Sequence, residues 1–170
     1  MRALTLATLL LLALTPVARA QDPIIQFAGD DPEMQAAMQE AVRSLPRFLS
    51  EALGADGVSR DGMAIKVELQ ADGSVAGMTE EIIWVAPFAR IDGGFAGLLA
   101  NEPQALGGLK AGDRIDFSQE QIVDWSFPGP DGKVYGNFTT RVMLPHLSDD
   151  ERATLTEALS ELAVPDFWTN

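Results

Sequence analysis

The stretch QIVDWSFPGPDGKVYGNFTTRVML, residues 121–144, decides the fold that the sequence predicts. Apolar and polar residues alternate on both sides of the segment 128–132, which is rich in proline, aspartate and glycine. This pattern is typical of a β-hairpin. We therefore expect one strand over residues 121–127 and a returning strand over residues 134–144.

Successive side chains of a strand point to opposite faces, so the returning strand would have two different faces. The core face would carry Val134, Gly136, Phe138, Thr140, Val142 and Leu144, and the other, more polar face would carry Tyr135, Asn137, Thr139, Arg141 and Met143. If Trp125 lies opposite Gly136, its ring covers the missing side chain, and Asp124 then lies opposite Asn137. Asp124 and Arg141 are then either an ion pair that stabilises the sheet, which we favour, or part of a ligand site.

Four further strands are expected before this hairpin. Residues 63–69 alternate as in a half-buried strand, and residues 81–88 are apolar at both parities, as in a central strand covered on both faces. Pro87 indicates an edge or a bulge near the end of that strand. Residues 95–100 and 114–117 predict two more strands, and the glycine-rich segment 107–113 between them fits turns and lacks the spacing of a phosphate-binding loop.

One helical segment is expected on each side of the strands. Asp31 and Pro32 predict a helix start, and the apolar spacing continues to about residue 44. Pro46 is expected to interrupt this helix, with a second short piece that ends at Gly54. A capping box from Ser148 to Glu151 predicts a last helix. Its buried residues would be Leu155, Leu159 and Leu162, and Pro165 would end it.

These elements predict a single α+β domain over residues 21–170. Its sheet would be curled, mostly antiparallel and made of five or so strands, forming a small, partly open barrel with an N-terminal and a C-terminal helix against it.

The first twenty residues predict a secretory signal peptide. Arg2 precedes an apolar run over residues 3–14, and Ala18-Arg19-Ala20 fits a cleavage site before Gln21. No later stretch is apolar enough to span a bilayer, so the mature protein is expected in the periplasm or outside the cell with no transmembrane segment.

Composition excludes several kinds of chemistry. The sequence has no cysteine, which removes disulfides, thiol nucleophiles and thiolate metal sites. The formal net charge is −13 for the whole chain, and it becomes −15 when Arg2 and Arg19 leave with the signal peptide. So much negative charge argues against a nucleic-acid partner. A basic protein or a cation stays possible, although acidic residues that only keep the protein soluble are the simpler explanation.

An ordered set of residues over positions 30 to 160 is similar to the YegJ-like family, which is an uncharacterised bacterial family classed as a domain of unknown function. The set comprises Asp30-Asp31-Pro32 with Met34, Leu45-Pro46 with Phe48, Glu81 with Trp84-Val85, Gly97 with Asn101 and Pro103, Gly112, Ile122 with Asp124-Trp125, Gly136, Arg141-Val142, and Ser148 with Glu151-Arg152. The resemblance implies the fold and bacterial export, and it brings no established activity. The family pattern has Glu-His where this chain has Glu81-Ile82, so no histidine mechanism is expected there.

No catalytic residue, metal site or cofactor is predicted. The sole histidine, His146, has no serine and acid to complete a triad, because Ser148 is needed as a helix cap. Of the acid pairs 30–31, 80–81 and 149–150, two lie at helix starts, where the helix dipole favours negative charge.

The leading hypothesis is an exported, non-catalytic domain that binds an unknown protein or small ligand in the cell envelope. The face predicted to bind comprises Glu81, Trp84, Asn101, Asp124, Trp125, Tyr135, Asn137 and Arg141. One alternative is a carboxylate-dependent hydrolase with Glu81, Asp124 and Arg141 in one cleft. Another is an acidic inhibitor or immunity-like protein that binds a basic partner.

Overall fold

The computed structural model of the chain describes residues 31–168. The predicted signal peptide and the lead-in to residue 30 lie outside the described residues. The helices are α1 (Pro32–Ala52), α2 (Phe138–Met143) and α3 (Asp149–Ala158), with short 3-10 turns at η1 (Gln119–Gln121), η2 (Leu144–His146) and η3 (Asp166–Trp168). Among the described residues, no helix combines the length and the apolar character needed to cross a membrane.

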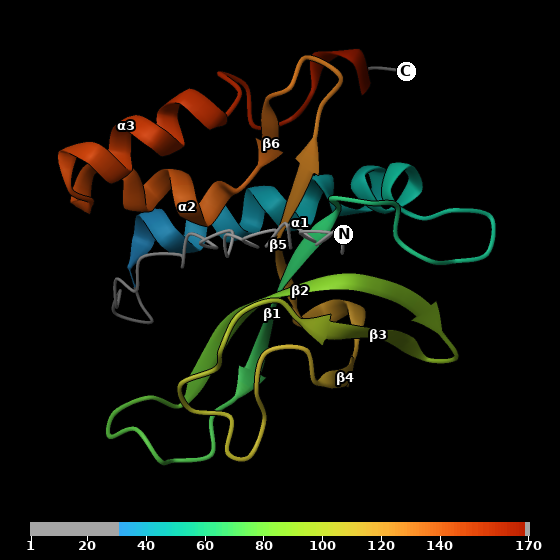
Figure 1. Cartoon of the computed structure of the whole chain (residues 1–170), viewed down its shortest axis with the longest axis vertical. Helices are drawn as coiled ribbons and strands as arrows, with labels where there is room; N and C mark the ends of the chain where they lie inside the picture. The colour runs from blue at the N-terminus through green and yellow to red at the C-terminus, as the bar shows by residue number, and fades with distance from the viewer. Residues whose placement is uncertain (1–30, 169–170) are drawn as a thin grey trace, which may run out of the picture.

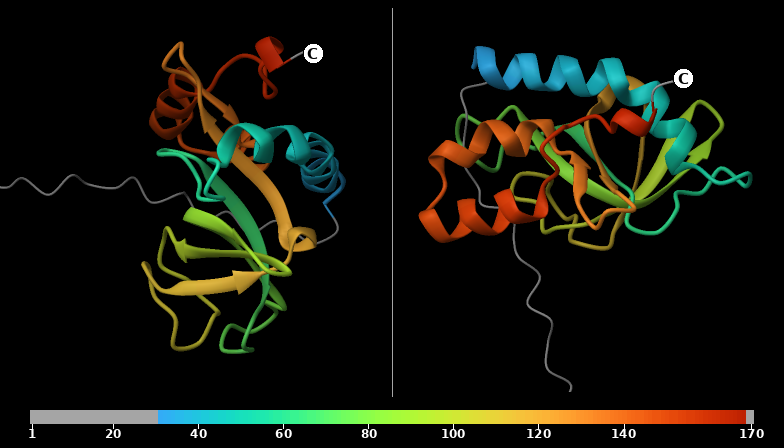
Figure 2. Two further views of the ribbon diagram at one scale, coloured as in Figure 1. Left: turned by 90° about the vertical axis from the view of Figure 1, so that its right-hand side faces the viewer. Right: turned by 90° about the horizontal axis from the view of Figure 1, so that it is seen from above.

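The six strands form one open antiparallel sheet, which confirms the α+β class and the curled, unclosed sheet (Figure 1). They are β1 (Ala64–Gln70), β2 (Glu80–Ile91), β3 (Gly94–Leu99), β4 (Arg114–Phe117), β5 (Ile122–Pro128) and β6 (Val134–Gly136). Their order across the sheet is β4-β3-β2-β1-β5-β6. Helix α1 lies across β5, with α2 and α3 beside its N-terminal half (Figure 2).

The predicted break at Pro46 is wrong, because Pro46 lies inside one continuous helix. The buried stripe runs on through Leu45, Phe48 and Leu49, and burial of these side chains offsets the roughly 3 kcal/mol that an internal proline costs a helix. The right-hand view of Figure 2 shows α1 changing direction toward its C-terminal end, as helices do near a proline.

Strand β2 is central, between β1 and β3, but only one of its faces is covered. Ile83 and Val85 are buried, whereas Ile82 is 36% exposed and Trp84 is half-buried. The prediction that both faces are covered is therefore wrong. The predicted bulge is confirmed, since the pairing of β2 with β3 shifts register between Val85 and Phe88, around Pro87.

The predicted returning strand ends far earlier than residue 144. Strand β6 stops at Gly136, with φ +73°, and Asn137 follows with φ +55°. Two successive residues in the left-handed region turn the chain out of the sheet, and α2 starts at Phe138. The two faces predicted for residues 138–144 are therefore wrong. Gly136 also pairs with Ser126 and not with Trp125.

The capping box at Ser148 and Glu151 is confirmed, but α3 ends at Ala158, well before Pro165. Beyond the helix the chain pairs with β6, since the Ser160 N–H donates to the Val134 carbonyl at 2.9 Å. The predicted buried stripe is correct only for Leu159, because Leu155 is half-buried and Leu162 is 53% exposed.

Trp125 is the centre of the core and has no exposed surface. Its ring stacks on Phe48 of α1 at 5.0 Å between centroids and contacts Trp168 at 5.4 Å. Its indole N–H donates to the Ala41 carbonyl at 3.1 Å. One side chain of β5 thus joins the sheet to α1 and to the C-terminal segment.

Replacing Gly136 with alanine should destabilise the fold by about 2–4 kcal/mol. The new Cβ would lie 2.1 Å from the Trp125 carbonyl oxygen and 2.5 Å from its ring, at a positive φ. Urea denaturation followed by tryptophan fluorescence measures the loss. Gly132→Ala is the matched control, because Gly132 has φ +77° and no atom within 4 Å. Equal losses in the two variants would contradict a role for the contact with Trp125.

Candidate binding surface

The residues predicted to form one binding face lie in several different environments. Trp125 and Tyr135 are buried, and the Tyr135 hydroxyl donates to the Asp131 carboxylate at 2.9 Å. Asn137 is buried too, and its side-chain amide donates to Ser126 Oγ and to the Tyr135 carbonyl, both at 3.1 Å. None of these three side chains presents an open surface to a partner.

Asp124 holds the start of α2. Its carboxylate accepts the N–H groups of Phe138 at 3.1 Å and Thr139 at 2.8 Å, and the Thr139 hydroxyl at 2.7 Å. Asn137, the residue in the N-cap position, makes no side-chain cap hydrogen bond. Asp124 therefore satisfies two orphan N–H donors of a helix that begins fourteen residues later in the chain.

Lys66 of β1 is the residue opposite Asp124. It is 7% exposed, its ammonium group donates to Thr139 Oγ1 at 3.0 Å, and it lies 4.7 Å from the centre of the Trp84 ring. Burial raises the pKa of the Asp124 carboxyl, while the positive charge of Lys66 and the Thr139 donors oppose that rise. Sequence analysis missed Lys66, because the outward positions of a half-buried strand are normally occupied by exposed polar residues.

Arg141 does not make the predicted ion pair with Asp124. Its guanidinium group donates to the Gly136 carbonyl at 2.8 Å, the Ser160 carbonyl at 2.9 Å and Ser160 Oγ at 3.3 Å. Burial lowers the pKa of Arg141, and the nearby charge of Asp124 opposes this change. The role of Arg141 is to join α2 to β6 and to the segment after α3.

Glu81 and Asn101 attach the loop 100–113 to β2. The buried Glu81 carboxylate accepts the N–H groups of Gln104 at 2.8 Å and Ala105 at 2.7 Å, and Asn101 Oδ1 accepts the Trp84 N–H at 3.3 Å. Glu81, Asp124 and Arg141 thus bind separate backbone segments, and no described hydrogen bond or salt bridge joins any two of them.

The open surface lies on the face of β1 and β2 that points away from the core. Ile65, Val67, Ile83 and Val85 are buried on the core side. Their neighbours therefore point the other way, with Lys66 paired to Trp84 and Glu68 paired to Ile82. Helices α1 and α2 pack on β5, and β2 to β4 extend away from them (Figure 1).

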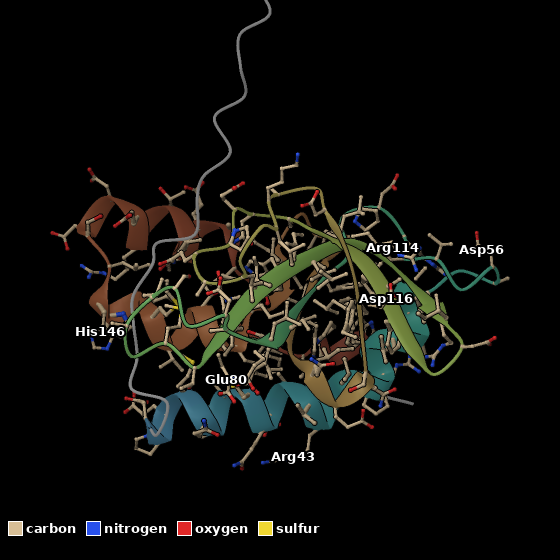
Figure 3. All side chains as sticks on the ribbon, turned by 90° about the horizontal axis from the view of Figure 1, so that it is seen from below. Arg43, Asp56, Glu80, Arg114, Asp116 and His146 are labelled. Atoms are coloured by element: carbon tan, nitrogen blue, oxygen red, sulfur yellow. The ribbon has the colours of Figure 1, made fainter. Side chains whose placement is uncertain are left out.

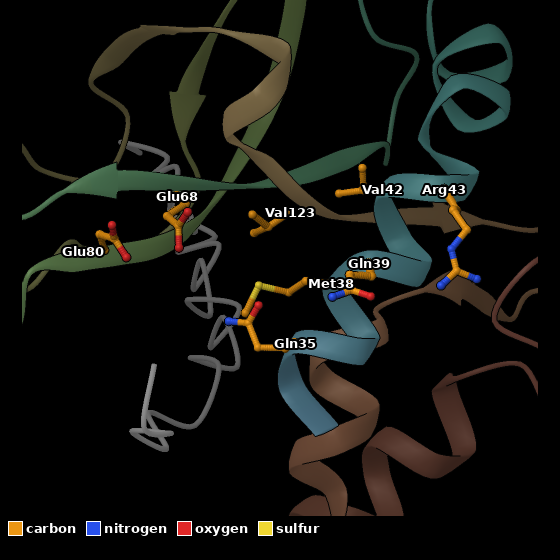
Figure 4. A pocket seen from close by; sticks show the side chains of 8 residues that line it. All are labelled: Gln35, Met38, Gln39, Val42, Arg43, Glu68, Glu80 and Val123. Carbon is orange, nitrogen blue, oxygen red and sulfur yellow. The ribbon is translucent and has the colours of Figure 1, made fainter. Parts of the chain in front are cut away.

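A groove of about 600 Å³ separates this face from α1 (Figure 4). Val123 lies between its two walls. It is the extra residue of a β-bulge, because Asp124 pairs with Lys66 while Ile122 pairs with Val67. One wall is formed by Glu68 and Glu80, and the α1 wall is formed by Gln35, Met38, Gln39, Val42 and Arg43.

The two glutamates of the groove interact with each other. Burial, the negative charge of Glu80 and a hydrogen bond with it raise the pKa of the Glu68 carboxyl. Of the salt bridges found within residues 31–168, none involves either glutamate. Arg43 pairs with Glu40 at 2.7 Å and points away from Glu80 (Figure 3).

His146 is exposed in η2. Over the part of the chain that the structure describes, no three histidine, aspartate or glutamate side chains come together as a metal site would need.

Comparison with known proteins finds relatives but no activity. The family model described as "Uncharacterized protein conserved in bacteria (DUF2314)" matches residues 31–160. The chain is also similar to "Uncharacterized protein YegJ" of Escherichia coli (strain K12), with 22% identity over 156 residues, covering 92% of this chain and 96% of that protein. No solved structure matches the chain.

The Asp124→Ala substitution should lower the free energy of unfolding by about 3–5 kcal/mol, because it leaves the buried N–H groups of Phe138 and Thr139 and the Thr139 hydroxyl without their acceptor and removes a charge that attracts Lys66. Urea denaturation followed by circular dichroism measures the loss. Asp116→Ala is the matched control, since Asp116 is an exposed acid that pairs with Arg114 on the surface. A loss no larger than that of the control would contradict the capping role. Combining Asp124→Ala with Lys66→Met should recover part of the loss.

The Glu68→Gln substitution should raise Tm by about 1–3 °C at pH 7 and change it little at pH 4. A carboxyl whose pKa is raised in the folded state contributes stability below its ordinary pKa, and this contribution is lost as pH rises through the raised value. At neutral pH two negative charges then face each other, and the amide relieves their repulsion. Differential scanning calorimetry at both pH values measures the effect.

Glu40→Gln provides the control of opposite sign, since it removes a partner of Arg43 and should not raise Tm at pH 7. An equal gain from Glu68→Gln at both pH values would show that charge repulsion is not the cause.

Proposed function

We propose that this chain, which belongs to the DUF2314 family of uncharacterised proteins conserved in bacteria, is an exported, non-catalytic binding domain of the cell envelope. It holds a partner protein on the open face of β1 and β2 and in the adjoining groove.

The observation that carries this proposal is the exposed apolar surface beside the groove. Ile82, which pairs with Glu68, is 36% exposed on the open face, and Val42, which lines the groove from α1, is 47% exposed. The half-buried Trp84 lies next along the same face of β2. Exposed apolar side chains that gather beside a groove and are bordered by charged groups are typical of protein interaction sites.

The contacts of Glu81, Asp124 and Arg141 favour binding over the hydrolase alternative. A hydrolytic site needs its acid, base and electrophile directed at one place that the substrate can reach. Each of these three side chains instead holds backbone of its own protein, and Glu81 and Asp124 are buried.

Export is proposed from the sequence. Arg2, the apolar run over residues 3–14 and Ala18-Arg19-Ala20 together have the pattern of a cleavable signal peptide. The location proposed for the mature protein is the periplasm or the medium.

A second candidate, an acidic inhibitor or immunity-like protein with a basic partner, is favoured by one specific observation. Glu68 and Glu80 bring two carboxylates into the groove, and no salt bridge found in residues 31–168 neutralises them.

Site-specific photocrosslinking in a Gram-negative host tests the leading proposal. The full chain carries benzoylphenylalanine at position 82, and the periplasmic fraction is collected after irradiation. We expect an adduct of one discrete mass and a mature chain that begins at Gln21. The matched control carries the crosslinker at position 162, another exposed apolar position. The same adducts from both positions, or none from position 82, would overturn the binding surface, and an uncleaved cytoplasmic chain would overturn export.

A further inference from the structure

The groove combines three kinds of surface. Gln35, Met38, Gln39 and Val42 recur at spacings of three and four, so they form one stripe along α1 beside its buried stripe. Met38, Val42 and Val123 make apolar surface, and the two glutamines add amides. Glu68 and Glu80 come from neighbouring strands and complete the opposite wall (Figure 4).

The charge of the groove is negative. Arg43 is the cation among the residues that line it, and Figure 4 shows its guanidinium group apart from both glutamates. Arg43 is engaged with Glu40. The whole chain has a formal net charge of −13, so the long-range field around the groove also attracts cations.

The apolar surface and negative charge of the groove favour some ligands over others. Phosphate groups and acidic peptides would be repelled. A divalent cation would lack ligands, since no third acid or histidine of residues 31–168 joins the pair. A second copy of the chain would bring two acidic surfaces together. An arginine side chain fits, because its stem packs on apolar surface while its planar group donates to two carboxylates at once.

We propose that the groove receives an arginine side chain of a basic partner protein. The guanidinium group donates to both Glu68 and Glu80 in place of the hydrogen bond between them, and the methylene stem contacts Met38, Val42 and Val123. The exposed Ile82, which pairs with Glu68 across the strands, extends the contact to neighbouring residues of the partner. This inference rests on the proposed function and names the chemistry of the partner.

Methyl NMR with short peptides tests the proposal on the protein purified from cells. The probe is acetyl-Gly-Arg-Gly-amide, and the matched peptides carry citrulline, which has the shape without the charge, or lysine. We expect the arginine peptide to shift the methyl signals of Met38, Val42 and Val123. The citrulline peptide should leave them unchanged, and the lysine peptide should bind more weakly.

The variant Glu68→Gln with Glu80→Gln should weaken binding of the arginine peptide by at least about tenfold, because two charge-assisted hydrogen bonds are lost. Asp116→Asn, which changes an exposed acid of β4 that does not line the groove, should keep the affinity. Equal shifts with citrulline, equal affinity for lysine, or full affinity in the double glutamine variant would each overturn the proposal.

The two experiments distinguish failure of the arginine assignment from failure of the proposed binding function. If the arginine peptide does not bind while the adduct at position 82 persists, the arginine assignment is wrong and the binding domain stands. If the adduct is also absent, the binding surface itself is wrong.

Discussion

The arrangement of the helices on the sheet depends on the hydrogen bonds that the Asp124 carboxylate accepts. This carboxylate is buried at the point where β5 has no strand hydrogen-bonded on its outer side, and it caps α2 from there. Lys66 brings β1 into the same network through Thr139. The next residue, Trp125, points to the other face and packs on α1. Two consecutive residues of β5 thus connect the sheet to α2 and to α1, which also contact each other.

Local patterns in the sequence predict most of the strands, because alternation and turn residues act over short distances. Predictions from these local patterns are wrong where one or two residues override the surrounding pattern. Gly136 and Asn137 end β6 by adopting left-handed backbone conformations, although the alternation of apolar residues continues beyond them. Pro46 does not end α1, because long-range burial of Phe48 and Leu49 outweighs a local preference.

The candidate site was harder to predict than the fold. Sequence reasoning selects polar residues that packing does not explain, and Glu81, Asp124 and Arg141 are of that kind. Buried polar residues that bind their own backbone have the same signature as residues that bind a ligand, because both need hydrogen-bond partners. Glu68 and Glu80 face Met38 and Val42 only once α1 has packed on β5, so no local pattern indicates the groove.

The bulge at Val123 means that β5 tolerates no change in its number of residues. In a regular strand Ile122 and Asp124 would share a face, but here Ile122 and Trp125 share the core face while Asp124 points away from it. Insertion or deletion of a single residue in this segment would exchange the tryptophan and the aspartate between the two sides of the sheet. Length variation among relatives should therefore be excluded from β5 and be absorbed by the loop between β1 and β2.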